Sequence, residues 1–408
     1  MNELGLRIKK LRKEKKLTLA ELAGDRLTKG MLSLIENGKA QPSMESLHYI
    51  ADQLGIDVSV LLNDGQVEQL RELLLEVEDA HKNLGNDKEQ IEKVLQKIEP
   101  LRHQLNGKNY EEVRLLDLWA LLHLSLGQDI GRQTMYEVID GYEKIHAYSR
   151  IIKCYTALCR EAFGQRNYRQ ALQYMQEAEK RIEPHIHLID KLTILDMNYN
   201  LMVLYAAIGN TKNTQKHFDY ALQIANEEKI YYRIDDFYRF IFTQAIDQDA
   251  HEECRYYLTK LEQHALFTEN RAAQYNAVIF KMQYANLIDH AYERVPQLLA
   301  ELDGALEEDF VREFIDSEIT YALWAQGRFK EAIEQSKDYR IPSFLHHPID
   351  LSILYKYFAV RALCYFEIGE IEAAKRDILY AMDGVKDLPS NIYNDFIREA
   401  YNKIQSSR

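Results

Sequence analysis

The chain has 408 residues, too many for one ordinary hydrophobic core, so we expect two or more domains or a repeat array. Apolar residues make up 46% of the chain and charged residues 28%, which is normal for a globular protein. No apolar run is long enough to cross a membrane, and the charged N-terminus does not read as a signal peptide, so we expect a cytoplasmic location. Four scattered cysteines without a Cys-x-x-Cys pair argue against a disulfide scaffold and a metal site.

The net charge of −13 is unevenly distributed along the chain. Residues 1–45 contain ten Lys or Arg and six Asp or Glu, a net of +4, which leaves −17 for the remainder. A small basic head on a large acidic body favours nucleic-acid binding by the head. A solvated helix face explains such a charge run equally well, so charge alone does not decide between the two readings.

Apolar spacing in the first residues predicts helices at about 3–15 and 18–24, with Thr18 as N-cap and Glu21 completing a capping box. Thr28 can cap a third helix, which Asn37-Gly38 ends. Pro42-Ser43 opens a fourth helix, and residues 58–62 form a short fifth helix. Five short helices with a tight turn between the second and third predict a helix-turn-helix domain over residues 1–64.

Three segments of this domain resemble the lambda-repressor/Cro type, also called the XRE group: LTLAELA (17–23), MLSLIENGK (31–39) and PSMESLHYIADQLGI (42–56). The resemblance implies that the third helix enters the major groove of duplex DNA. It also implies that Arg7 pairs with Glu36 and braces that helix. The residues so placed on DNA are Thr28, Lys29, Gly30, Met31, Ser33, Leu34, Asn37, Lys39 and Gln41.

The residue types at the start of the third helix suit such a role. A helix N-terminus with an adjacent Lys29 attracts phosphate. Gly30 removes a side chain and lets the backbone approach the duplex, although a neutral substitution there is the simpler alternative. Leu34 can meet a thymine methyl group.

The remaining residues contain a repeat. Turn-plus-helix segments begin at Gly127, Arg166, Gly209, near Asp249 and His290, and at Gly327 and Gly369, at intervals of 39, 43, 40, 41, 37 and 42 residues. In three of them a small residue stands five positions after the turn residue, as in Ala171, Ala332 and Ala374. Each unit reads as a helical hairpin whose neighbours must stack to bury its apolar face. The spacing resembles tetratricopeptide repeats, which implies a right-handed α-solenoid over residues 107–408, with connector helices in 65–106.

The first helix of each hairpin is expected to line a concave surface. In residues 195–209, Leu201, Leu204 and Tyr205 are assigned to packing, which turns Asp196, Tyr199, Asn200 and Val203 to the concave side. Asn200 matches an asparagine that in peptide-binding arrays holds a peptide backbone, and an amide supplies both donor and acceptor. Each of these residues, taken singly, is equally well explained as a solvated wall residue. The candidate peptide-binding residues are Lys153, Arg160, Asp196, Tyr199, Asn200, Tyr275, Asn276, Ser317 and Tyr321, with Glu318 beside them.

The combination of head and array resembles the RRNPP group, the peptide-pheromone regulators of Gram-positive bacteria. The resemblance implies a DNA-binding transcription regulator that forms a homodimer or larger oligomer and senses a short linear signalling peptide. Two alternatives remain open: an array that binds a response-regulator protein, and a peptide-independent repressor whose array only dimerises. No catalytic motif or phosphate-binding loop is visible, so neither an enzyme nor a cofactor is expected.

Overall fold

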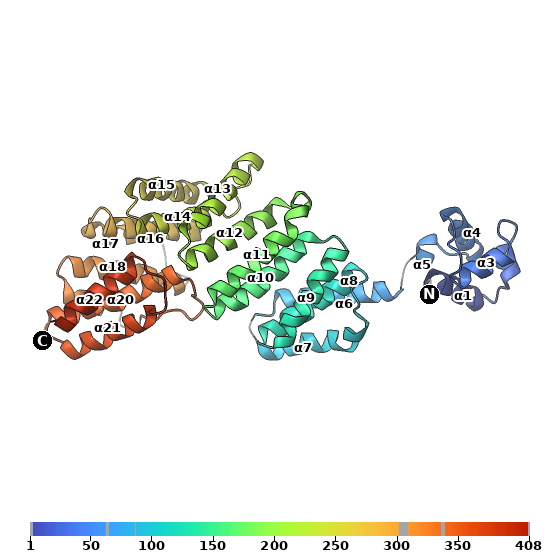
Figure 1. The fold of residues 1–408 in the computed structure, drawn as a ribbon, viewed down its shortest axis with the longest axis horizontal. Helices are drawn as coiled ribbons and strands as arrows, with labels where there is room; N and C mark the ends of the chain where they lie inside the picture. Colours follow the sequence, from blue (N-terminus) through green and yellow to red (C-terminus); the bar gives the residue numbers. More distant parts are fainter. Residues whose placement is uncertain (1–2, 63–64, 86, 302–308, 336–338, 407–408) are drawn as a thin grey trace. The chain divides into compact units, whose positions relative to one another are not determined.

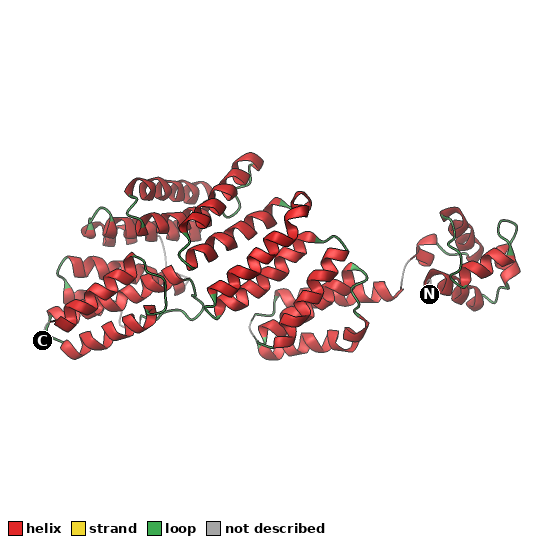
Figure 2. Ribbon diagram, in the orientation of Figure 1, coloured by secondary structure: helices red, strands yellow, loops and turns green. Residues whose placement is uncertain are grey.

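The computed structural model describes residues 3–62, 65–85, 87–301, 309–335 and 339–406. Within these residues all regular structure is helical (Figure 2), which confirms the expected all-α class. Contacts divide the chain into two compact units, residues 1–145 and 146–408. The predicted domain boundary beside residues 63–64 lies outside the described residues and stays a prediction.

The first unit begins with the five-helix head (Figure 1), whose bounds are α1 Glu3–Glu14, α2 Leu19–Ala23, α3 Lys29–Glu36, α4 Met44–Leu54 and α5 Val58–Leu62. Both parts of the Thr18 capping box are present, and Thr28 caps α3. Gly55 ends α4 in the left-handed conformation. The core of the head gathers Ile8, Leu22, Leu32, Leu47 and Leu54, so the predicted set of five short helices is confirmed.

The rest of the first unit contains the predicted connector helices and one hairpin. Its elements are α6 Gly65–Lys82, α7 Lys88–Ile98, a 3-10 helix Glu99–Gln104, α8 Tyr110–Ser125 and α9 Asp129–Lys144. Helix α8 packs against α6, α7 and α9 and has a nearly continuous buried surface.

The second unit stacks further hairpins, α10 with α11, α12 with α13, α14 with α15, and α20 with α21. Its helices are α10 Tyr148–Gly164, α11 Tyr168–Ile182, α12 Lys191–Ala207, α13 Thr211–Glu228, α14 Ile234–Asp247, α15 His251–Thr268, α16 Arg271–Leu287, α17 Val295–Leu299, α18 Asp309–Ala325, α19 Phe329–Glu334, α20 Pro348–Glu367, α21 Ile371–Val385 and α22 Ile392–Ser406, with 3-10 helices Glu183–Leu188 and Tyr292–Arg294.

The seven predicted turns share one backbone conformation. Each turn residue has φ between 53° and 84°, the left-handed region, including the non-glycine residues Arg166, Asp249 and His290. The small residues after these turns, Ala171, Ala332 and Ala374, are fully buried. The turn shared by all seven, with a buried alanine at the same distance after three of them, identifies the hairpins as repeats, whereas the handedness of their superhelix stays a prediction.

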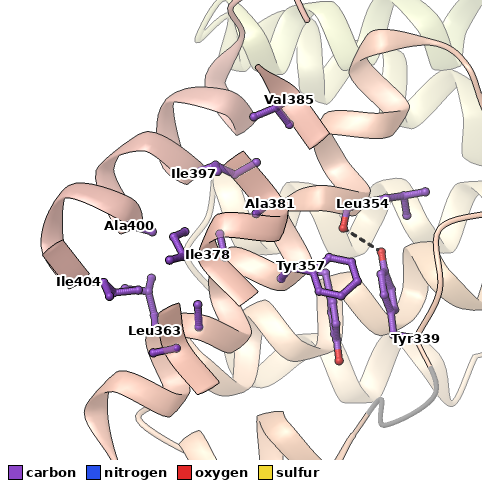
Figure 3. Close-up of a cluster of buried hydrophobic side chains, with 14 of the residues drawn as sticks. Tyr339, Leu354, Tyr357, Leu363, Ile378, Ala381, Val385, Ile397, Ala400 and Ile404 are labelled. Atoms are coloured by element: carbon purple, nitrogen blue, oxygen red, sulfur yellow. Dashed lines mark hydrogen bonds between the residues drawn. The ribbon is translucent and has the colours of Figure 1, made fainter. Parts of the chain in front are cut away.

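Figure 3 shows how the last hairpin closes its core. Ile378 and Ala381 of α21 face Ile397 and Ala400 of α22, and all four side chains are at most 3% exposed. Nearby, Tyr339 stacks on Tyr357 with ring centroids 3.7 Å apart and donates a hydrogen bond to the Leu354 carbonyl at 3.2 Å. Helix α22 therefore covers the apolar face that the final repeat would otherwise expose.

Candidate DNA-binding and ligand-binding surfaces

Helix α3 has a buried face and an exposed face. Leu32 and Ile35 are buried in the core of the head, as predicted. The opposite face exposes Lys29, Met31 and Leu34, the last two at 46% and 44%. A helix that carries a cation and two apolar side chains into solvent suits a partner with phosphates and methyl groups.

The N-terminus of α3 is open. The Thr28 hydroxyl accepts a hydrogen bond from the Met31 amide at 3.1 Å, while the Lys29 side chain is exposed. A Cβ added at Gly30 would have only the Thr28 hydroxyl within reach, at 4.0 Å, so packing inside the head does not require glycine there. The absent side chain leaves space only on the exposed side of the helix.

The C-terminal end of α3 is closed by its own side chains. Asn37 donates from its amide nitrogen to the Ser33 carbonyl at 2.8 Å, and Ser33 is half-buried. Lys39 and Gln41 follow on the exposed turn. All nine predicted DNA-binding residues thus lie on one short helix, its N-cap and the turn after it, and those with side chains have them exposed or half-buried.

The ion pair that holds α3 differs from the expected one. Glu36 is 3% exposed and receives two hydrogen bonds from Arg12, at 2.6 and 2.9 Å, and not from Arg7. Arg7 instead donates to the Leu61 carbonyl at 2.8 Å. Five residues along α1 rotate the side chain by about 140°, so Arg7 and Arg12 face different helices. The hydrogen bonds that Arg12 donates to Glu36 raise the pKa of Arg12, which keeps the pair charged.

Gly5 of α1 was not singled out by sequence reasoning, yet α3 depends on it. A Cβ at this position would lie 2.2 Å from the Ile35 carbonyl oxygen. The two helices therefore approach at the C-terminal end of α3 more closely than any side chain allows. Glycine in the interior of a helix is the signal in the sequence, because it weakens the helix unless close packing compensates.

In the second unit, several of the predicted peptide-binding residues are accessible. Lys153 and Arg160 of α10 are exposed, and Asn200 of α12 and Asn276 of α16 are half-buried. Asp196 accepts a hydrogen bond from Arg233 at 2.5 Å. Arg233 also lies over the Tyr199 ring, 4.8 Å from its centre, and burial raises the pKa of Tyr199 to about 12.

The expected exposure of Tyr275, Ser317 and Glu318 is wrong. Tyr275 is 4% exposed within an apolar cluster, and its hydroxyl accepts a hydrogen bond from Arg271 at 2.9 Å. Ser317 is fully buried and donates to the Ile353 carbonyl at 3.4 Å. These residues face neighbouring helices. The hairpins are stacked so tightly that more of the surface of each first helix is buried than the repeat register predicts.

Glu318 belongs to a buried polar network that sequence reasoning missed. It accepts hydrogen bonds from Lys356 at 3.1 Å and from the Asn286 amide at 2.8 Å. All three side chains are at most 1% exposed. A glutamate and a lysine 38 residues apart on successive first helices are the only trace of this network in the sequence.

Residues 341–347, the crossing segment, precede α20 and contact helices far away in the sequence. The Tyr168 hydroxyl donates to the His346 carbonyl at 2.7 Å, and the His347 Nε2 donates to the Val203 carbonyl at 3.4 Å. The His347 ring lies against Phe163 and Phe240, at 6.3 and 5.3 Å between centroids. The face of α12 assigned to a peptide therefore borders residues of the same chain.

The His347 ring is held neutral by its surroundings. Its Nδ1 accepts a hydrogen bond from the Ile349 amide at 3.3 Å while Nε2 donates to Val203. Burial lowers the pKa of His347, partly offset by Asp350. Burial raises the pKa of Asp350 in turn.

Together, a five-helix head that exposes helix α3 and a stack of helical hairpins define a two-part, all-helical protein. No helix among the described residues is long and apolar enough to cross a membrane.

The helix-turn-helix family model matches residues 8–61. An immunity repressor protein of Bacillus phage phi105 is 33% identical over 128 residues, which cover 30% of this chain and 83% of the repressor. The chain belongs to the same helix-turn-helix family as this repressor.

Solved structures give weaker likenesses. Bacillus thuringiensis PlcR in complex with the peptide PapR7 and DNA is 17% identical, covers 66% of this chain and 99% of that chain, and has a TM-score of 0.31. The Streptococcus dysgalactiae SHP pheromone receptor Rgg2 is 14% identical, covers 67% and 98%, and has a TM-score of 0.33. ComR from Streptococcus suis is 16% identical with a TM-score of 0.29. TM-scores this low do not establish a shared overall arrangement.

Proposed function

We propose that the chain is a DNA-binding transcription regulator of the cytoplasm whose helical array binds a short linear signalling peptide and thereby alters DNA binding. The observation that carries the DNA-binding part is the exposed face of α3, with Lys29 at an open helix N-terminus and Met31 and Leu34 beside it. The family relationship to a phage repressor supports the same role.

The DNA-binding proposal is tested with the full chain. Sequences selected from random duplex DNA provide a probe, and fluorescence anisotropy measures its affinity. The double variant Lys29→Ala/Ser33→Ala should lower affinity by about 10-fold to 100-fold if Lys29 reads a base. Lys10→Ala is the matched control, because Lys10 is an exposed cation of α1 outside the proposed surface. Equal affinity of the double variant and the parent would rule out α3 as the recognition helix.

We further propose that the chain acts as a homodimer or larger oligomer. One head reaches one half-site, so two heads are needed for a site repeated at about one helical turn. Light scattering with and without the selected duplex measures the assembly. A monomer in both conditions contradicts this part of the proposal but does not affect the assignment of α3 as the recognition helix.

Peptide binding rests on the accessible amides and cations of the second unit. An extended peptide has unpaired N–H and C=O groups, and leaving one buried without a partner costs about 1–3 kcal/mol. Asn200 and Asn276 offer a donor and an acceptor each, and Arg160 or Lys153 can hold a terminal carboxylate.

Pooled random peptides, selected on the full chain and identified by mass spectrometry, supply a peptide probe. Calorimetry and DNA binding are then compared for the parent and Asn200→Ala. The variant should bind the selected peptide more weakly, and peptide should change the parent's DNA affinity, because a ligand shifts an equilibrium only by binding one state better. Unchanged peptide binding by Asn200→Ala removes this part of the array from the site.

A further inference from the structure

A pocket of about 580 Å³ lies among the first helices of the later hairpins in the second unit. Its lining comes from the end of α14, from α16, α18 and α20, from the start of α22, and from the loops that hold His290 and Ser390-Asn391. Tyr321 and Phe396 form an aromatic wall, with ring centroids 5.8 Å apart. The volume is within the range of pockets that bind small ligands.

The rim of the pocket is acidic. Asp247, Asp395 and Glu399 contribute carboxylates from two helices that are far apart in the sequence. Asp247 accepts a hydrogen bond from the Ile392 amide at 2.7 Å, and Asp395 pairs with Arg398 at 3.0 Å. Partial burial raises the pKa of Asp247, and the nearby Asp395 adds to this effect. A positive charge between these groups would relieve their repulsion.

The cation inside the pocket does not offset this acidity. Lys356 is 1% exposed and forms an ion pair with Glu318 at 3.1 Å. Its ammonium group also lies 4.8 and 5.4 Å from the ring centres of Tyr321 and Tyr393. The charge of Lys356 is therefore already compensated by Glu318, as that of Asp395 is by Arg398, which leaves Asp247 and Glu399 as the carboxylates available to a cation.

One buried polar group in the lining has no partner. Tyr393 is 1% exposed, and its hydroxyl forms no hydrogen bond with a described residue. Burial, with Glu318 and Asp247 nearby, raises the pKa of this hydroxyl. The hydroxyl oxygen is inaccessible to solvent, and Tyr393 packs in a core with Phe242 and Cys254, so a ligand in the pocket meets the rest of the lining rather than this oxygen.

We propose that this pocket binds a cationic side chain, the guanidinium of an arginine or the ammonium of a lysine, from the peptide that the array recognises. The cation lies between the rim carboxylates and the aromatic wall, where cation–π attraction adds to the charge pairing. This inference rests on the proposed peptide-binding function and specifies both a subsite and the chemistry of the ligand at it.

The test uses pooled hexapeptides in which one position is fixed in turn as arginine, lysine, citrulline or glutamate. Citrulline retains the shape of arginine without its charge. Peptides retained by the full chain are identified by mass spectrometry, and calorimetry compares the best arginine peptide with its citrulline counterpart. We expect the parent chain to prefer arginine over citrulline by about 10-fold or more, the usual strength of a charge-assisted hydrogen bond.

Variants test whether the preference for arginine over citrulline arises at this pocket. Asp247→Asn/Glu399→Gln should reduce the ratio of the affinities for the arginine and citrulline peptides to about 3-fold or less. The attraction that remains for arginine is mainly cation–π. Glu252→Gln, which removes one exposed carboxylate of α15 outside the pocket, should leave the ratio unchanged. Tyr393→Phe should leave both the preference for arginine and the melting temperature unchanged, because the deleted hydroxyl is inaccessible from the pocket and forms no hydrogen bond with a described residue.

The outcomes separate the two proposals. Peptides bound without regard to charge, or with a charge preference that the rim variants leave intact, overturn the cationic subsite and leave peptide binding by the array in place. Retention of no peptide counts against both. Spermidine serves as a free cation, and if it binds in a rim-dependent manner while arginine peptides do not, the ligand is not a peptide side chain and the inference is wrong.

Discussion

The head places its functional side chains outside a small core, whereas the second unit encloses many of its polar groups. Lys29, Met31 and Leu34 are exposed on α3, but Lys356 and Glu318 are 1% and 0% exposed between first helices. An outward surface suits a large rigid partner such as a duplex. An inward polar network with a pocket beside it suits a ligand small enough to enter. The difference predicts that substitutions separate DNA affinity from ligand affinity.

Both regions also contain a buried ion pair, and the two pairs provide the largest expected effects. Lys356→Met should lower the free energy of unfolding of the second unit by about 4 kcal/mol, because Glu318 would remain charged and buried without a cation. Urea denaturation followed by circular dichroism measures the loss. Lys356→Met/Glu318→Gln should recover most of it, and a single variant as stable as the parent would show that the pair is dispensable.

The ion pair of the head should respond less strongly. Arg12→Met leaves Glu36 without its cation, but the Arg12 side chain is 11% exposed, so water reduces the cost to about 3 kcal/mol. The same denaturation experiment, combined with DNA anisotropy, should show that both stability and affinity fall. Lys10→Met is the control on α1, where the cation is 78% exposed and no measurable change is expected. Equal effects of the two substitutions would contradict a bracing role for Arg12.

Two glycines of the head test close packing against open space. Gly5→Ala forces a Cβ toward the Ile35 carbonyl and should destabilise the head by about 2 kcal/mol. Gly30→Ala meets open space and should stabilise α3 by up to about 1 kcal/mol, because alanine favours helix. In thermal denaturation we expect Gly5→Ala to lower the melting temperature and Gly30→Ala to raise it. If Gly30→Ala weakens DNA binding while it stabilises the head, the bare backbone at that position contacts the duplex.

The pH dependence of the second unit provides an effect comparable to that of the glycine substitutions. Burial lowers the pKa of His217 to about 4, and its ring pairs with Asn198 at 2.9 Å. The unfolded chain binds the proton below about pH 6.5 and the folded chain only near pH 4, so stability falls as the pH drops through this window. We expect a loss of about 2 kcal/mol from this residue between pH 7 and 5. His217→Gln should flatten that part of the profile, and an unaltered profile would exclude His217 as the source.

Local signals in the sequence predict the helices better than they predict the sites. Thr18 and Thr28 cap their helices as expected, and the turns at Gly127 and Arg166 are where the repeat predicts them, because caps and turns depend on a few neighbouring residues. The partner of Glu36 and the burial of Ser317 depend on how helices rotate against one another. A resemblance to a family in sequence register does not determine how far each helix is rotated.

The pocket and the crossing segment are further beyond the reach of the sequence. Asp247 and Ile392 meet across 145 positions, and Val203 and His347 across 144. No local pattern marks either partner, because each residue is an unremarkable polar or apolar residue in its own helix. Two adjacent histidines before Pro348 suggest a special turn at most, and not the distant carbonyl that one of them contacts.

The crossing segment has a consequence for how the array folds. Hairpins that touch only their neighbours can fold in any order and can be shortened from either end. Here Tyr168 and Val203 bond to His346 and His347, at separations of 178 and 144 residues, so early hairpins finish packing only after residue 347 has been synthesised. Long-range closure of this kind slows folding and couples distant repeats into one cooperative transition. A chain cut before residue 341 would keep its first hairpins but leave Phe163 and Phe240 without the ring that covers them.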